Sequence, residues 1–405
     1  MFIWIMLAVF LGIVIGFVTG LAPGIHPNTV FALTLSLMPL VAGFPVEGII
    51  AFIVALSISN VFFDFIPSII FGAPEEDSVL SVLPGHRMLL EGRGYEAIFL
   101  TAMGGLGVVF FTIISLPAMI YFLPIVYSAI KPIIHILLII AVSWMVYKEK
   151  RKLAALLIFT TAGIFGFISL NSFPSDFALF PALTGLFGFS TILTSLMAKT
   201  RIPAQKTQEE VHGDWLKGSL AGWIAGLLSG LLPGLGSSQT GIMASQLLKA
   251  KVREFLIALG GISASNMLFT FIVFYVLGKT RSGAVWAISQ VVDSFTVADV
   301  SIVIAVGVLV SLLSAVITIK TGKFMLRKMK NVNYSKVSFS ILLMLIALVV
   351  LLSGFHGIMI SVTGTFLGLL AISAGVKRTH LMGFLVFPTI LYFSGLDPLF
   401  IGMLW

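Results

Sequence analysis

The sequence predicts an all-α polytopic membrane protein, in which two inverted-topology repeats carry broken helices or helical hairpins that meet near the membrane centre. Three observations support this prediction. Of the 405 residues, 59% are hydrophobic and 10% are charged, against roughly a quarter charged in a soluble domain. Apolar runs long enough to cross a bilayer, about 17 to 25 residues each, follow one another with few breaks. Two motifs of the first half recur in the second.

The composition also excludes several functions. Cysteine is absent, so the chain has no disulfide, no thiolate metal site and no cysteine nucleophile. The net charge of +8 comes from short clusters between apolar runs, so we expect no nucleic acid partner. Motifs of metalloproteases, serine hydrolases and nucleotide-binding loops are missing. We therefore expect no enzyme activity, no catalytic residue, no metal site and no cofactor, apart from a possible coupling Na⁺ or H⁺.

The first recurring motif is GFVTGLAPG at residues 16–24 and GLLSGLLPG at residues 226–234. The second is SISNVFFDFIPSIIFG at 57–72 and SASNMLFTFIVFYVLG at 263–278. Because the order and the approximate spacing are kept, the motifs predict internal duplication rather than a chance match of apolar residues.

The duplication divides the chain into three parts. We expect a first transmembrane repeat at 1–198, a polar cytoplasmic linker at 199–217, and a second transmembrane repeat at 218–405. The apolar start of the chain lacks the basic region and cleavage site of a signal peptide, and we expect it to be a structural helix.

The distribution of basic residues predicts how the repeats are oriented, because short loops rich in Lys and Arg tend to stay in the cytoplasm. Basic clusters occur at 148–152, 199–206, 320–336 and 377–378. A pair of apolar segments separates the first two clusters, at about 153–169 and 177–197, and another pair separates the last two, at about 337–353 and 356–375. Each pair returns the chain to the side it left. The second repeat therefore begins in the cytoplasm, whereas the uncharged N-terminus is expected outside.

The loops that follow the two Pro-Gly elements agree with this arrangement. Residues 37–48 contain no basic residue, whereas residues 249–254 read KAKVRE. The two loops are therefore expected on opposite sides of a cell membrane, as inverted repeats require. Lys279 and Arg281 are an exception, because this scheme places them outside.

The matched Pro-Gly breaks predict a substrate site. Backbone groups freed by a break inside a membrane must be buried in protein or line a cavity, and the new helix ends would face each other across the repeat interface and hold a carboxylate or phosphate. Kinks that allow close helix packing are the alternative. The candidate substrate-binding residues are Pro23, Gly24, His26, Asn28 and Thr29 in the first repeat and Pro233, Gly234, Ser237, Ser238, Gln239 and Thr240 in the second.

Asp64 is the one acidic residue deep within a long apolar run. An ionisable group there is costly and is a candidate proton carrier or cation ligand, although a local role near a helix end is the alternative. Its repeat counterpart is Thr270. Asn60 and Asn266 stand at equivalent positions, where their amides either contact substrate or ion or join helices by hydrogen bonds.

Two other polar residues are candidates. His26 lies beside the first break and either couples protonation to substrate binding or forms an ordinary hydrogen bond. Arg87 follows a Pro-Gly pair and either meets a substrate anion or belongs to a solvated loop.

The G-x-x-x-G-x-x-P-G element in both halves, together with GAPEEDSVLSVLPGHRMLLEGRGYEA at 72–97, resembles the large membrane subunit of tripartite tricarboxylate transporters, the TctA family. The family segment PGTPAAAATALDGYPLARQGRAGRA is similar in register at Pro74, Ser78, Pro84, Gly85, Leu90, Gly92 and Gly94. The resemblance spans most of the chain and implies a secondary carrier for small carboxylates, helped by a solute-binding protein and a small membrane subunit.

The chain departs from the family pattern in two ways. It is about a hundred residues shorter than expected for the family, and Glu75, Glu76 and Asp77 replace small neutral residues. This acidic trio would repel an anion unless it is neutralised, for which Arg87 is a candidate. With Asp64, we assign the trio to the coupling ion or proton.

The leading hypothesis is a cation- or proton-coupled secondary transporter for a small anionic solute, in which one half rocks against the other. Membrane lipids and a second copy of the chain are further expected partners. A translocase for a polyprenyl-phosphate lipid is one alternative. An intramembrane enzyme acting on lipid phosphates is another, and it would need His26 and Asp64 close together.

Overall fold

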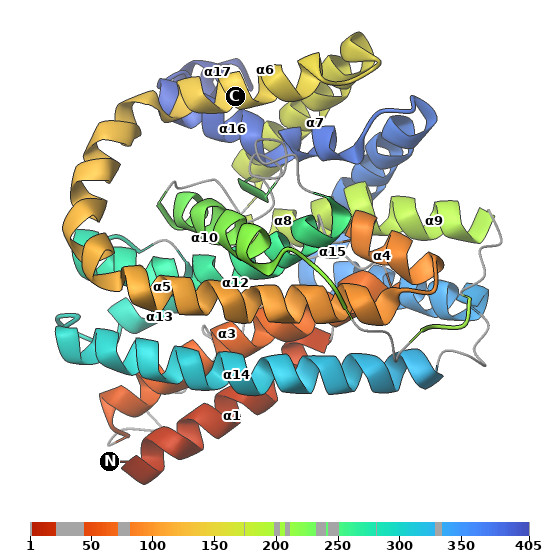
Figure 1. The fold of residues 1–405 in the computed structure, drawn as a ribbon. Helices are drawn as coiled ribbons and strands as arrows, with labels where there is room; N and C mark the ends of the chain where they lie inside the picture. The colour runs from red at the N-terminus through yellow and green to blue at the C-terminus, as the bar shows by residue number, and fades with distance from the viewer. Residues whose placement is uncertain are drawn as a thin grey trace.

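All regular secondary structure in the computed structural model is helical over the residues that it describes, namely 2–21, 44–71, 82–173, 175–197, 203–206, 211–231, 240–241, 251–280, 282–328 and 334–404 (Figure 1). The helices are α1 (Phe2–Leu21), α3 (Val46–Phe71), α4 (Val82–Leu90), α5 (Gly94–Ile130), α6 (Ile134–Tyr147), α7 (Lys152–Ser172), α8 (Ser175–Leu183), α9 (Ser190–Met197), α10 (Trp215–Leu231), α12 (Val252–Leu277), α13 (Gly283–Ser289), α14 (Val297–Lys328), α15 (Tyr334–Ser373), α16 (Gly383–Ser394) and α17 (Asp397–Leu404). Seven helical stretches among them are long and apolar enough to cross a membrane. The predicted all-α polytopic fold is therefore confirmed.

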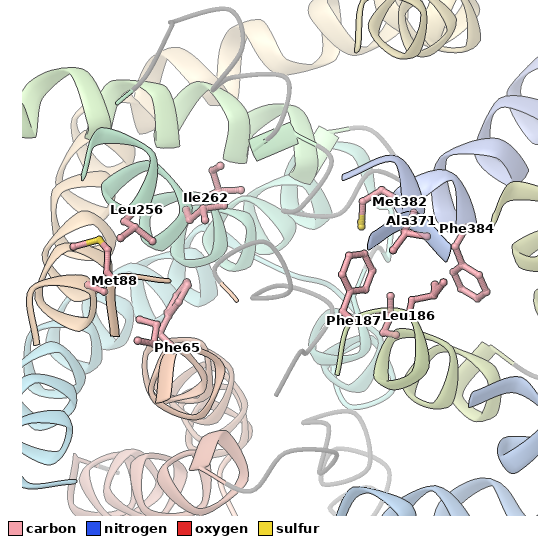
Figure 2. Close-up of a cluster of buried hydrophobic side chains, with 14 of the residues drawn as sticks. Phe65, Met88, Leu186, Phe187, Leu256, Ile262, Ala371, Met382 and Phe384 are labelled. Atoms are coloured by element: carbon pink, nitrogen blue, oxygen red, sulfur yellow. The ribbon is translucent and has the colours of Figure 1, made fainter. Parts of the chain in front are cut away.

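The helices pack as two bundles. The first bundle consists of α1, α3, α5, α10, α12 and α14 with the short α4 and α13, and the second of α6, α7, α8, α9, α15 and α16. Figure 2 shows buried side chains from both: Phe65, Met88, Leu256 and Ile262 lie in one group, and Leu186, Phe187, Ala371, Met382 and Phe384 lie in another. The bundles are joined through the last turns of α5, which continue into α6 (Figure 1). Both halves of the sequence contribute helices to each bundle.

The helices that carry the Ser-x-Ser-Asn motifs occupy the interior of the first bundle. In the apolar 18-residue stretch of each helix, 94% of the residues are buried in α3 and 89% in α12, compared with 28% in α1. α1 therefore presents much of its apolar surface outwards, whereas α3 and α12 are enclosed by other helices. The serines of both motifs are buried, as are Asn60 and Asp64 of the first.

Glycines of the first motif bring each outer helix against its inner partner. Along α1, Gly12, Gly16 and Gly20 meet successive turns of α3, and a β-carbon on Gly16 would overlap the Ser59 hydroxyl. In the second half, Gly222, Gly226 and Gly230 meet successive turns of α12, and a β-carbon on Gly226 would overlap the Ser265 hydroxyl. Small residues favour such packing in membranes, because the hydrophobic effect does not drive helices together in lipid and close van der Waals contact must do so. Because successive turns match, α1 runs parallel to α3, and α10 runs parallel to α12.

Helices of one half also pack against helices of the other half. α5 of the first half packs along α12 of the second, and α14 of the second half packs along α3 of the first. The Thr318 hydroxyl of α14 donates to the Phe62 carbonyl of α3 at 3.2 Å, and Gly307 of α14 lies beside Ile58. α5 and α14 run in opposite directions, because Gly94 lies against Leu326 and Gly322 lies against Ile98.

One end of the first bundle is rich in basic residues, and we call it the basic end. Arg93 and Arg253 both donate to Glu96, at 2.7 and 2.5 Å, which joins the first turns of α5 and α12. Lys217 pairs with Glu254 at 3.2 Å, so α10 begins there too. Residues 203–206 of the linker lie against the turn between α4 and α5, where the backbone N–H of Lys206 donates to the carbonyl of Gly92. α14 ends at the same place. Thus α5, α10 and α12 begin at the end where α3 and α14 finish, and α1 runs towards the same end.

α5 is too long to be a single straight crossing. Its 37 residues correspond to about 55 Å at 1.5 Å per residue, whereas the hydrocarbon core is about 30 Å thick. Pro117 and Pro124 lie inside the helix, and proline bends a helix because it removes a hydrogen bond. α5 accordingly curves away from the first bundle and leads into α6 of the second (Figure 1).

The second bundle contains two interruptions. α15 is broken at Gly354, whose φ of 59° and ψ of −150° lie in a region that glycine adopts without strain, so residues 334–373 form two helical stretches. Between α8 and α9, residues Thr184–Phe189 form a π-helix. Arg378 is buried against it and donates to the carbonyls of Leu186 and Phe187 at 3.0 and 2.7 Å. Burial lowers the pKa of Arg378 to about 10, so the side chain stays charged at neutral pH.

Tight glycine packing leads to a stability prediction. Gly226→Ala should destabilise the protein by about 1–3 kcal/mol because the new methyl group overpacks a buried contact, and thermal unfolding in detergent measures the loss. Ser265→Gly in the same chain should restore part of it by removing the side chain that is overlapped. Gly402→Ala is the matched control, because nothing lies within 4 Å of its β-carbon position. Equal melting temperatures for Gly226→Ala and the control would contradict the packing argument.

Candidate functional site

A buried polar face on α3 forms the candidate site. Asn60, Asp64 and Ser68 are 4%, 3% and 0% exposed, and their four-residue spacing places them on one face of the helix. The Ser68 hydroxyl donates to Oδ1 of Asp64 at 3.4 Å. Asp64 lies beside Gly20, in the last turns of α1. This face therefore adjoins the helix end that leads into the first Pro-Gly element.

Asn60 links the inner helix to the outer one. Its Nδ2 donates to the Thr19 hydroxyl of α1 at 3.0 Å, and that hydroxyl donates to the Ile15 carbonyl at 3.0 Å. A buried amide is costly unless it is hydrogen-bonded, and this bond fulfils the requirement. Of the two roles considered for Asn60, the structure shows the interhelical hydrogen bond.

The equivalent position in the second half differs. Asn266 of α12 is partly exposed, and within the described ranges its amide makes no hydrogen bond. Thr270, the counterpart of Asp64, donates from its hydroxyl to the Met267 carbonyl at 2.8 Å and lies 3.4 Å from the Ser282 hydroxyl. The two halves thus differ at both positions: Asp64 corresponds to Thr270, and the bonded Asn60 corresponds to Asn266, whose amide makes no hydrogen bond within the described residues.

The serines of the Ser-x-Ser-Asn motifs serve helix packing. The Ser59 hydroxyl donates to the Gly12 carbonyl at 3.3 Å, and the Ser265 hydroxyl donates to the Gly222 carbonyl at 3.5 Å. Each bond crosses from the inner helix to its outer partner at the glycine contact. The motif is therefore a packing element in both halves, and its asparagine is the residue whose environment differs.

Arg87 lies away from the polar face of α3. Its side chain is 81% exposed and pairs with Glu91 at 3.1 Å along α4. The preceding residue, His86, is buried, and its Nδ1 lies 3.0 Å from the carbonyl of Ile69, which fastens α4 to the end of α3. Burial lowers the pKa of His86, which favours a neutral ring at pH 7 that donates from Nδ1 to this carbonyl.

Many predicted site residues fall outside the described part of the chain. Thr240 is described, and it is buried with 1% exposure. The predicted roles of the others stay predictions, as does the meeting of Gly24 with Gly234. The residues concerned are Pro23, Gly24, His26, Asn28, Thr29, Glu75, Glu76, Asp77, Pro233, Gly234, Ser237, Ser238 and Gln239.

Thr19, which fixes the orientation of Asn60, is not among the site residues predicted from the sequence. The signal was present, because both copies of the first motif carry a hydroxyl residue directly before the second glycine, Thr19 in one and Ser229 in the other. Ser229 is also buried. Across the described ranges, no group of three or more His, Asp or Glu side chains has the arrangement needed to hold a metal ion.

Comparison with known proteins agrees with a membrane transporter. The model of the tripartite tricarboxylate transporter TctA family matches residues 6–383. The uncharacterized protein MJ1079 of Methanocaldococcus jannaschii is 32% identical over 379 residues, which cover 91% of this chain and 94% of that protein. No solved structure matches the chain. Since the family match spans nearly the whole sequence, the chain belongs to the tripartite tricarboxylate transporter TctA family, a family of transporters and not of enzymes.

Proposed function

We propose that the chain carries a small carboxylate anion across the membrane by alternating access, driven by a coupling cation. The observation that supports this most strongly is the buried polar face of Asn60, Asp64 and Ser68, next to the helix end that leads into the first Pro-Gly element. Its copy in the second half offers the amide of Asn266. The family to which the chain belongs supports the carboxylate as cargo.

The directions of the helices support inverted topology for the two halves. α1 and α3 run towards the basic end, whereas their counterparts α10 and α12 begin there and run away from it. α5 begins at the basic end, and its counterpart α14 finishes there. Such a relation places equivalent helix breaks on opposite sides of a shared centre, which is where many secondary transporters bind their substrates.

Asp64 is the proposed coupling group. A carboxylate that is 3% exposed within an apolar helix is costly unless a proton or a cation neutralises it. The counterpart Thr270 carries no charge, so only one half provides a group of this kind. We propose that Na⁺ or H⁺ at Asp64 prepares the adjoining site for an anion, since the ion removes the negative charge that would repel it.

The enclosure of α3 and α12 favours a soluble solute over a lipid. A translocase for a phosphate-headed lipid needs a lateral opening through which a head group reaches the site. In α3 and α12, 94% and 89% of the residues of the apolar 18-residue stretch are buried. The helices that bear the polar residues are therefore mostly surrounded by protein. Family membership removes the support for the intramembrane enzyme.

We also propose partners of the kind with which the family normally works, a small membrane subunit and a solute-binding protein. The exposed apolar faces of α1 and α15 suit contact with lipid or with another membrane protein. A homodimer remains a prediction from the sequence.

A thermal-shift experiment tests the carboxylate function. Citrate and related di- and tricarboxylates should raise the melting temperature of the purified protein, because a ligand that binds the folded state stabilises it by about 2.7 kcal/mol at a hundred times its Kd. Prenyl phosphates and amino acids serve as controls. Stabilisation by prenyl phosphates alone would favour the lipid hypothesis and contradict ours.

The coupling role predicts a specific effect of Asp64→Asn. In the native protein, stabilisation by citrate should depend on Na⁺ or on pH, because the ion neutralises Asp64. The neutral amide should abolish that dependence while the protein still folds, which the melting temperature without ligand verifies. If citrate binding to the variant keeps the ion dependence of the native protein, Asp64 has no part in coupling.

The two asparagines should respond differently to substitution. Asn60→Ala removes the hydrogen bond to Thr19 and should cost about 1–3 kcal/mol of stability. Asn266→Ala breaks no bond of the described structure, so the melting temperature should hardly change, whereas stabilisation by citrate should weaken several-fold. Calorimetric unfolding with and without citrate measures both effects. Unchanged citrate binding in Asn266→Ala would exclude its amide from the site.

A further inference from the structure

A cavity of about 810 Å³ opens at the end of the first bundle opposite the basic end. Its walls include Tyr127 and Lys131, at the end of α5, and Lys279 and Thr280, which follow α12. α12 begins at the basic end and contains 26 residues, so the cavity lies about 39 Å along that helix at 1.5 Å per residue. This distance places it across the membrane from the basic end.

The described residues that line the cavity include two lysines and no acidic residue. The lysines come from two different segments, and within the described ranges neither Lys131 nor Lys279 forms an ion pair. The ammonium of Lys279 donates to the Tyr127 hydroxyl at 3.0 Å and lies 4.6 Å from the centre of its ring. Because Tyr127 is itself buried, this contact restrains Lys279. The C-terminal ends of α5 and α12 favour positive charge nearby.

Lys279 is also an exception to the charge rule that orients the chain. Basic residues of short loops are normally concentrated on the cytoplasmic side, whereas Lys279 lies at the opposite end of α12 from Arg253. A binding role accounts for a cation at this position. The size of the cavity falls within the range of small-molecule sites, about 300 to 1,000 Å³.

We propose that this cavity is a second anion site, which binds a soluble solute with two or more carboxylates before it reaches the membrane centre. The choice of a carboxylate as ligand rests on the proposed function, whereas the cavity and its two lysines do not depend on it. Two lysines and the Thr280 hydroxyl provide charge-assisted and neutral donors for carboxylate oxygens. The rings of Tyr392 and Phe393 form an apolar wall, against which the carbon chain of such a solute packs.

The absence of native cysteine allows a direct test. Tyr392→Cys places a single thiol at the cavity wall, where the native side chain is 65% exposed, and an environment-sensitive fluorophore attached there reports binding. Citrate at low ionic strength should change the emission, and added KCl should weaken binding because exposed charges are screened. A label at Met197→Cys on α9, 82% exposed in the native chain, should not respond.

The double variant Lys131→Gln with Lys279→Gln should raise the half-saturating citrate concentration about tenfold, since each exposed charge pair contributes only a few-fold. Lys328→Gln is the matched control, because it removes one exposed lysine from the basic end, and it should stay within about twofold. Melting temperatures confirm that all variants are folded. Equal citrate responses in the double variant and the native protein would overturn the proposal.

Two further outcomes separate this site from the proposed function. If the label at position 392 responds but no carboxylate is transported in proteoliposomes, the cavity stands and the transport proposal fails. If transport proceeds while the label stays silent up to about 10 mM citrate, far above the usual micromolar to millimolar substrate range, the cavity proposal fails alone. Native mass spectrometry gives a further check. A phospholipid that is bound to the native protein and absent from the double lysine variant would also overturn the proposal.

Discussion

The close approach of α1 to α3, and of α10 to α12, is the constraint on which the first bundle depends. Helices in lipid gain little from hiding apolar surface, so contact through small residues must hold them together. At Gly16 and Gly226 no side chain fits, and the approach allows Ser59 and Ser265 to bond backbone carbonyls of the outer helices. The same contact, made once in each half, fixes each inner helix against the last turns of its outer partner.

Enclosure of the inner helices makes an intramembrane carboxylate tolerable. Asp64 lies on a helix surrounded by protein, with the Ser68 hydroxyl as a donor, and Asn60 is bonded to Thr19. The second half shows the same glycine packing with different chemistry, because Thr270 stands at the position of the carboxylate and Asn266 makes no hydrogen bond within the described residues. Similar packing therefore supports two unlike polar sites, which suits a carrier that binds a cation and an anion together.

The helical class and the burial of Asp64 follow from patterns visible in the sequence, because long apolar runs directly reflect burial in lipid and protein. The bond between Thr19 and Asn60 was harder to predict, since it depends on which turns of α1 and α3 face each other. The cavity beside Lys279 joins residues more than 250 positions apart, and no local pattern marks it. For the same reason Arg378 looked like a loop cation, although it is buried against the π-helix between α8 and α9.

The packing of helices from one half against helices of the other limits the movements by which the site opens to alternate sides of the membrane. Simple rocking of one half against the other would separate α5 from α12 and α14 from α3. The contact between α5 and α12 is especially close, since β-carbons on Gly104 and Gly260 would overlap the facing backbone. Among the described residues, the two bundles are connected by the bent end of α5 and also share buried apolar side chains, and each bundle contains helices from both halves. We therefore propose that alternating access moves the second bundle relative to the first, with the proline-containing turns of α5 as the hinge.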